Sequence, residues 1–104
     1  MSFPVVFRRE AKSEFDEVVV WYEGRRAGLG REFMVCVEAV LERIKKTPEI
    51  HTIVYADVRC GLVRRFPYGI YYRLEANRVV VVAVFHGSRD PEVWQRRARE
   101  TGRN

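Results

Sequence analysis

The chain has 104 residues, of which 47% are apolar and 32% are charged, and its formal net charge is +5. This length predicts a single domain over residues 1–104, and the composition excludes a disordered tail. The longest apolar run, Val79 to Phe85, is too short to span a bilayer, and the N-terminus lacks a secretory signal, so we expect a cytoplasmic protein with no membrane partner.

The positive charge is concentrated in the second half of the chain. Residues 1–51 hold nine basic and nine acidic side chains, whereas residues 52–104 hold ten arginines and five acidic side chains. Because the planar guanidinium group suits bidentate contacts with phosphate or carboxylate, this surplus predicts an acidic partner, either a nucleic acid or a protein segment.

The first half predicts a short strand over Phe3–Phe7 followed by two helices. The first helix has an apolar stripe and is expected to end between Tyr22 and Arg26, where glycines interrupt the pattern. The second helix repeats the stripe and stops before Pro48. Two helices joined by a short glycine-rich loop form a helical hairpin.

The second half predicts three strands, at Gly61–Phe66, Gly69–Glu75 and Arg78–His86, divided by turn residues. Strands joined by such short links are antiparallel neighbours. Asp90 and Pro91 are typical of the start of a helix, here a short C-terminal one. We therefore predict an α+β fold: a strand, a helical hairpin and a three-stranded antiparallel meander in one sheet with helices on one face, then a short helix.

Alternation along the middle strand of the meander separates two rows of side chains. Ile70, Tyr72 and Leu74 are expected to face the core. The opposite row is polar or faces a ligand, and it contains Tyr71, Arg73 and Glu75.

The last strand departs from this alternation, because Val79 to Phe85 is apolar on both faces. A strand buried on both sides needs a cover on each face. Either the short C-terminal helix with Trp94 covers the second face, or another polypeptide does. We favour a contribution from a partner, because an apolar patch ringed by arginines is typical of a protein interface.

The order of elements and two local motifs resemble the RelE/ParE superfamily of bacterial toxins, especially its ParE-like branch. The motifs are Arg64-Arg-Phe-Pro-Tyr68 and Phe85-His-Gly-Ser-Arg-Asp-Pro91. The resemblance implies the toxin of a type II toxin–antitoxin module, neutralised in a hetero-oligomer by a small acidic antitoxin. Such an antitoxin would supply the cover that the last strand lacks.

The resemblance leaves the target open. ParE-like members poison DNA gyrase, RelE-like members cut messenger RNA on the ribosome, and a degenerate member would serve only as a structural partner in a repressor complex. Metal-independent RNA cleavage requires a base, an acid and cations around one phosphate. The candidates for those roles are the cations Arg65 and Arg73, the proton-transfer group His86, and Tyr71 with the base Glu75.

Each candidate also has a structural interpretation. Arg65 and Arg73 are expected to pair with an antitoxin carboxylate or with Glu75. Tyr71 is expected to be a half-buried sheet aromatic, and His86 to hydrogen-bond its turn. Lysine is absent from the second half and Gly87 follows the histidine, unlike active RelE-like nucleases, which favours the non-hydrolytic interpretation.

On the non-hydrolytic interpretation the protein has no catalytic site, and binding falls to its surface. The C-terminal stretch from Arg89 to Arg99 is the predicted contact element, because Trp and Arg dominate interface energetics. The predicted contact residues are Arg64, Arg89, Trp94, Arg96 and Arg97.

The two cysteines, Cys36 and Cys60, are expected to be free thiols, and no zinc-ligand spacing occurs, so we expect neither a metal nor a cofactor.

Overall fold

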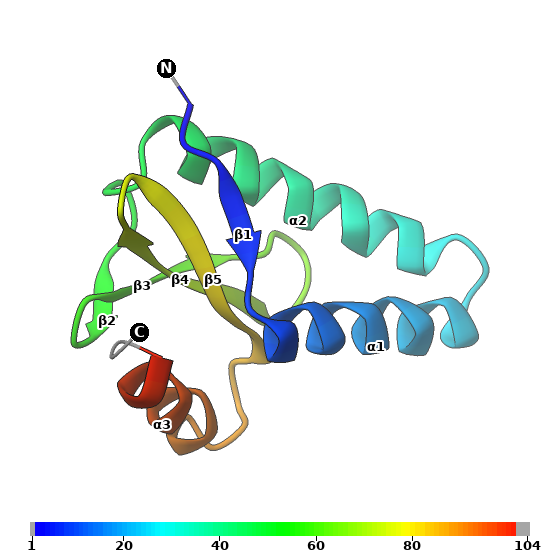
Figure 1. The fold of residues 1–104 in the computed structure, drawn as a ribbon. Helices are drawn as coiled ribbons and strands as arrows, with labels where there is room; N and C mark the ends of the chain where they lie inside the picture. The colour runs from blue at the N-terminus through cyan, green and yellow to red at the C-terminus, as the bar shows by residue number, and fades with distance from the viewer. Residues whose placement is uncertain (1, 102–104) are drawn as a thin grey trace.

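The computed structural model describes residues 2–101 and contains a five-stranded sheet in the order β1-β5-β4-β3-β2 with helices on both sides (Figure 1). Residues 1 and 102–104 of the predicted domain lie outside the described residues. In chain order the elements are β1 (Val5–Phe7), α1 (Arg9–Arg25), α2 (Leu29–Lys46), β2 (Ile53–Tyr55), β3 (Val58–Leu62), β4 (Tyr68–Glu75), β5 (Arg78–His86) and α3 (Glu92–Thr101).

The hairpin of α1 and α2 covers one face of the sheet, as predicted (Figure 1). Both helices turn their apolar stripes inward, so that Phe33, Val37 and Val40 of α2 are buried against Ile70 and Tyr72 of β4. This packing follows from the 3.6-residue period seen in the sequence. It forms the larger of the two cores.

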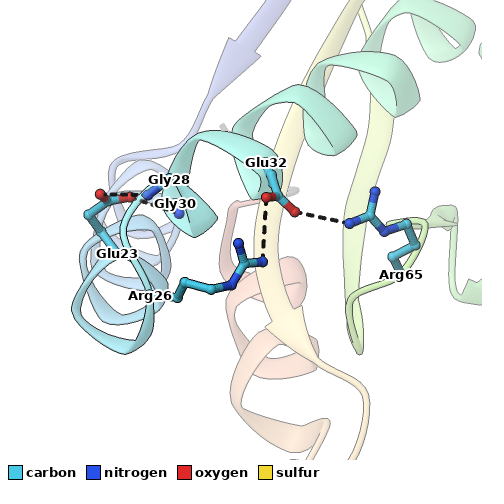
Figure 2. A network of polar contacts seen from close by, with 6 residues as sticks. All are labelled: Glu23, Arg26, Gly28, Gly30, Glu32 and Arg65. Carbon is cyan, nitrogen blue, oxygen red and sulfur yellow. Dashed lines mark hydrogen bonds and ion pairs between the residues drawn. The ribbon is translucent and has the colours of Figure 1, made fainter.

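The tip of the hairpin is closed by a carboxylate. Glu23, near the end of α1, accepts hydrogen bonds from the backbone N–H groups of Gly28 at 2.9 Å and Gly30 at 3.0 Å (Figure 2). These donors belong to the first turn of α2, where no carbonyl of the helix can reach them. Gly28 has a φ of 89°, and a Cβ on Gly30 would lie 2.7 Å from the Val19 carbonyl oxygen, so both positions favour glycine.

The predicted antiparallel meander is confirmed for β3, β4 and β5, and β1 joins the sheet as a parallel partner of β5. A two-residue turn links β4 to β5, with Ala76 and Asn77 at φ values of 49° and 65°. Positive φ at both central positions is the geometry that matches the twist of a hairpin. The predicted turn at these residues is therefore correct.

The first meander strand differs from its prediction. The strand expected over Gly61–Phe66 runs instead over Val58–Leu62, and the additional short strand β2 pairs with it. The chain turns away at Val63, whose N–H donates to the Tyr68 carbonyl oxygen at 2.9 Å. Phe66 then packs back onto the aromatic rings of the hairpin rather than extending the strand.

The second face of β5 is covered by the chain itself. Val82, Ala83 and Phe85 are buried against Trp94 and Ala98 of α3, which lies across the sheet from the hairpin (Figure 1). Of the two alternatives, the C-terminal helix is therefore the cover, and the favoured expectation that a partner covers this face is wrong. Trp94 and Ala98, at 3% and 1% exposure, are the residues of the helix that enter this second core.

Candidate binding surface

Two members of the predicted catalytic set lie on the hairpin side of the sheet. Arg65, in the loop between β3 and β4, forms an ion pair with Glu32 of α2 at 3.0 Å (Figure 2). His86 ends β5 with its ring 5.1 Å from that of Tyr68. Its Nδ1 accepts the backbone N–H of Ser88 at 3.0 Å. The imidazole therefore stabilises its own turn, as the structural interpretation predicts.

The other members belong to the opposite face, under α3. Tyr71 stacks on Trp94 with 4.5 Å between ring centroids. Arg73 is 6% exposed and pairs with Asp57 at 2.7 Å, while its Nη1 donates to the Ala98 carbonyl oxygen at 2.9 Å. Arg73 thus secures the C-terminal half of α3, where helix carbonyls attract a cation. The row predicted to face a ligand is structural.

The remaining protonation chemistry does not favour catalysis. Burial raises the pKa of Tyr71 to about 12, so its hydroxyl is a weaker acid than an exposed tyrosine. The Glu75 Oε2 atom is buried at the end of β4 without a hydrogen-bond partner among residues 2–101. Since His86 packs on one face and Tyr71 on the other, the five candidates do not surround one position. The hypothesis that they converge on one phosphate is wrong.

The row of β4 side chains predicted to face the core, Ile70, Tyr72 and Leu74, is only partly buried. Ile70 and Tyr72 are fully buried, as predicted, but Leu74 is 38% exposed. Leu74 is the second-last residue of β4 and lies next to the turn at Ala76 and Asn77. Alternation fixes the side of the sheet to which a residue points, whereas burial also requires an element above it.

Two of the predicted contact residues are structural. Trp94 is only 3% exposed and belongs to the core between α3 and the sheet, so the prediction that it contacts a partner is wrong. Arg97 is also largely buried, with its Nη2 2.9 Å from the Glu14 carboxylate of α1. Arg89 and Arg96 are exposed: the guanidinium of Arg89 lies 4.8 Å from the Phe85 ring, and Arg96 is 3.9 Å from Glu92.

Glu14 is a key residue that the sequence analysis did not single out. Its Oε1 accepts the Val84 backbone N–H at 3.0 Å, and Arg97 donates to the Val82 carbonyl oxygen at 2.9 Å. The pair therefore satisfies the edge of β5 beyond the end of β1, which reaches only Val81. A signal was present, because Glu14 stands three residues after Ala11 and four before Val18, within the apolar stripe of the helix.

A basic groove lies on the outer side of α2. It is a hollow of about 320 Å³ between the helix and the loop that follows β3. The groove is lined by Val35, Cys36, Ala39, Arg43, Arg64 and Arg65. Arg64, a predicted contact residue, is therefore at the surface where a partner could reach it. Cys36 is a free thiol, as is Cys60, in agreement with the sequence.

The arginines of this basic groove differ in how strongly they are engaged. Arg65 is held by Glu32, which also contacts Arg26 at 3.4 Å (Figure 2). Among residues 2–101, Arg43 and Arg64 have no carboxylate within ion-pair distance. Two of the three guanidinium groups are thus available to an incoming carboxylate or phosphate.

The loop that carries Arg64 and Arg65 is packed against the helical hairpin. Phe66 packs edge-on against Phe33 of α2 at 5.2 Å and against Tyr22 of α1 at 4.9 Å. Arg65 has a φ of 72°, in the left-handed region that a side chain adopts only when its surroundings hold it there. The basic groove is therefore largely formed before any partner arrives, which lowers the entropic cost of binding.

The chemistry of the basic groove defines the partner that it fits. Val35 is 52% exposed and Met34 37% exposed on the same helix, so apolar surface lies beside the guanidinium groups. A segment that alternates acidic and apolar side chains can fill both kinds of surface at once.

Among residues 2–101, no group of three or more His, Cys, Asp or Glu side chains is placed to hold a metal ion. No helix in that range is long and apolar enough to cross a membrane.

Comparison with known proteins gives matches of two kinds, to a family model and to solved structures. A family model described as "ParE toxin of type II toxin-antitoxin system, parDE" matches residues 5–91. A solved structure titled "Chromosomal ParDE TA system from P. aeruginosa" superposes with a TM-score of 0.61 at 13% identity, covering 82% of this chain and 96% of that chain. At this identity the likeness establishes the fold alone. No protein with a curated description matches the chain.

Proposed function

Because this chain belongs to the ParE toxin family of type II toxin–antitoxin systems, we propose that it is a toxin held inactive by direct binding of a small acidic antitoxin. The observation that carries this proposal is the basic groove, where Arg43 and Arg64 flank apolar surface without carboxylate partners of their own among residues 2–101. An antitoxin segment with acidic and apolar side chains fits it. The complex is a hetero-oligomer in the cytoplasm.

The target that we propose is DNA gyrase, and the mode of action is binding without hydrolysis. The separation of His86 from Tyr71 and Arg73 by the sheet supports this choice, because acid–base cleavage of RNA needs its groups around one phosphate. Arg73 has its guanidinium committed to Asp57 and to α3, and is nearly inaccessible. Stabilising a cleaved gyrase–DNA complex requires surface contacts only.

The test compares two targets with one protein preparation. Purified chain is incubated with gyrase and supercoiled plasmid, and the fraction of linear, enzyme-linked DNA is measured. In parallel, the chain is added to translating ribosomes with a reporter RNA, and cleavage is followed by primer extension. We expect accumulation of linear DNA and intact RNA. Addition of the antitoxin should abolish the gyrase effect.

Each other outcome identifies a different function. Cleaved RNA with normal gyrase turnover would contradict the proposed target and favour a ribosome-dependent messenger RNA endonuclease. In that case His86→Ala and Arg65→Ala should each slow cleavage by about tenfold or more. Inactivity in both assays, with a stable antitoxin complex, would favour a structural partner in a repressor complex.

A further inference from the structure

The outer face of α1 presents an aromatic side chain to solvent. Trp21 is 54% exposed and its neighbour Val20 is 71% exposed. Together with Asp16 and Glu17 they line a shallow hollow of about 380 Å³ whose surface is almost entirely apolar. This face points away from the sheet and shares no lining residue with the basic groove of α2. The chain itself therefore leaves this face uncovered within residues 2–101.

The charges around Trp21 are unpaired within the described chain. The guanidinium of Arg25 lies 4.7 Å from the centre of the Trp21 ring, but among residues 2–101 neither Arg25 nor Glu17 has an ion-pair partner. Asp16, by contrast, is occupied by Lys12 at 2.8 Å. An acidic and a basic side chain, neither with an ion-pair partner among residues 2–101, thus stand on either side of one exposed indole.

Their spacing is self-complementary. Glu17, Trp21 and Arg25 follow one another at intervals of four residues, so they lie along one line of the helix surface. A two-fold axis through Trp21 that makes two such helices antiparallel places indole against indole. The same operation sets Glu17 of each copy opposite Arg25 of the other.

We propose that this face binds a second copy of the chain, forming a symmetric dimer through antiparallel α1 helices. The two indoles cover the apolar hollows, and two symmetric Glu17–Arg25 ion pairs enclose them. Gly24 lies three residues after Trp21, and no heavy atom lies within 4 Å of the place where its Cβ would stand, so the helix surface is open at this point. A parallel arrangement is disfavoured, because it would set like charges against each other.

The extent of the contact predicts a weak, concentration-dependent dimer. α1 has 17 residues, which at about 1.5 Å per residue gives a contact roughly 25 Å long. A stable dimer interface buries about 800 Å² per partner, more than one helix of this length provides. Self-association is therefore a property of concentrated toxin, and it leaves the basic groove open in both copies.

The test is sedimentation velocity on the full chain between about 10 µM and about 1 mM, the range in which weak associations appear. We expect the weight-average sedimentation coefficient to rise with concentration. Glu17→Arg alone and Arg25→Glu alone should each weaken association at least tenfold. An equimolar mixture of the two variants should recover association to within about threefold, because only a mixed pair then has opposite charges at both ends.

Trp21→Ala should abolish association, whereas Glu38→Arg, an exposed charge reversal on α2, should leave it unchanged. Circular dichroism and thermal unfolding verify that every variant folds. A wild-type chain that stays monomeric up to about 1 mM overturns the proposal, and so does a mixture that behaves like its separate components. If the antitoxin shields Trp21 fluorescence from an added quencher while the chain shows no self-association, the proposal is wrong and the face binds the antitoxin.

Discussion

Glu14 and Arg97, 83 positions apart in the chain, meet with their charged atoms 2.9 Å apart at the open edge of β5. The pair links α1 on one side of the sheet to α3 on the other. Each member also binds a backbone group of β5, at Val84 and Val82 respectively. The side chain of Glu14 is 21% exposed and that of Arg97 is 13% exposed, so water screens this ion pair only weakly.

We expect Glu14→Ala to lower the free energy of unfolding by about 2–4 kcal/mol, because it removes the only carboxylate paired with the largely buried Arg97 guanidinium among residues 2–101 and leaves the Val84 backbone N–H without its acceptor. Urea unfolding followed by circular dichroism measures the loss. The matched control is Lys12→Ala on the same helix, whose ion pair with Asp16 is exposed at 58% and 55% and should contribute less than about 0.5 kcal/mol. Equal losses in the two variants would contradict the role of Glu14.

Trp94 provides the cover of β5 and should behave as a core residue. Trp94→Ala is expected to cost about 3–5 kcal/mol, since it removes the ring that stacks on Tyr71 and leaves a cavity over Phe85. Hydrogen exchange should accelerate first in α3. Arg96→Ala, an exposed change on the same helix, should leave stability within about 0.5 kcal/mol of wild type. A fully stable Trp94→Ala variant would restore the view of Trp94 as a contact residue.

The basic groove predicts a charge-dependent antitoxin affinity. Arg64→Glu should weaken binding of the antitoxin by tenfold or more, and the loss should shrink as salt is raised, because the contact is electrostatic. Calorimetric titration at two salt concentrations measures both effects. Arg78→Glu changes net charge equally at the exposed start of β5, outside the basic groove. Equal losses for both variants would mean that net charge alone, and not the groove, attracts the antitoxin.

His51 makes stability sensitive to mild acid. Burial, together with the nearby charge of Arg43, lowers the pKa of His51 below its usual 6.5, and its Nε2 has no hydrogen-bond partner among residues 2–101. Above the unfolded pKa the ring is neutral in both states. As pH falls below 6.5 the unfolded chain binds the proton first, so the free energy of unfolding should decrease.

Urea unfolding at about pH 7.5, 6.5 and 5.5 tests this dependence. His51→Gln should flatten the profile over that range, whereas His86→Gln, which retains His51, should keep it. An identical slope in His51→Gln and wild type would assign the acid sensitivity to other groups.

The helical hairpin and the meander were predictable because their determinants are local. The apolar stripes of α1 and α2 and the turn at Ala76 and Asn77 depend on residues close to one another in sequence. The short strand β2 and the end of β3 were missed, since the turn at Val63 is decided by where Phe66 packs.

The roles of the charged side chains were not predictable in this way. Arg65 and Arg73 were expected to pair with an antitoxin carboxylate or with Glu75, but within the chain Arg65 pairs with Glu32, 33 positions away, and Arg73 with Asp57. From the sequence, Arg73 is a candidate for catalysis and Arg97 a candidate for partner contact. In the structure both lie under or within α3 and are largely buried.

The sequence by itself thus determined the family, the order of most elements and the surplus of guanidinium groups. Only the tertiary structure decided which guanidinium groups are committed inside the fold, such as those of Arg73 and Arg97. It also decided that Arg43 and Arg64 line the basic groove without a carboxylate partner among residues 2–101. The physical reason is that an amphipathic period is encoded within a few residues. The partner of a charge is whichever opposite charge the packed chain brings within reach.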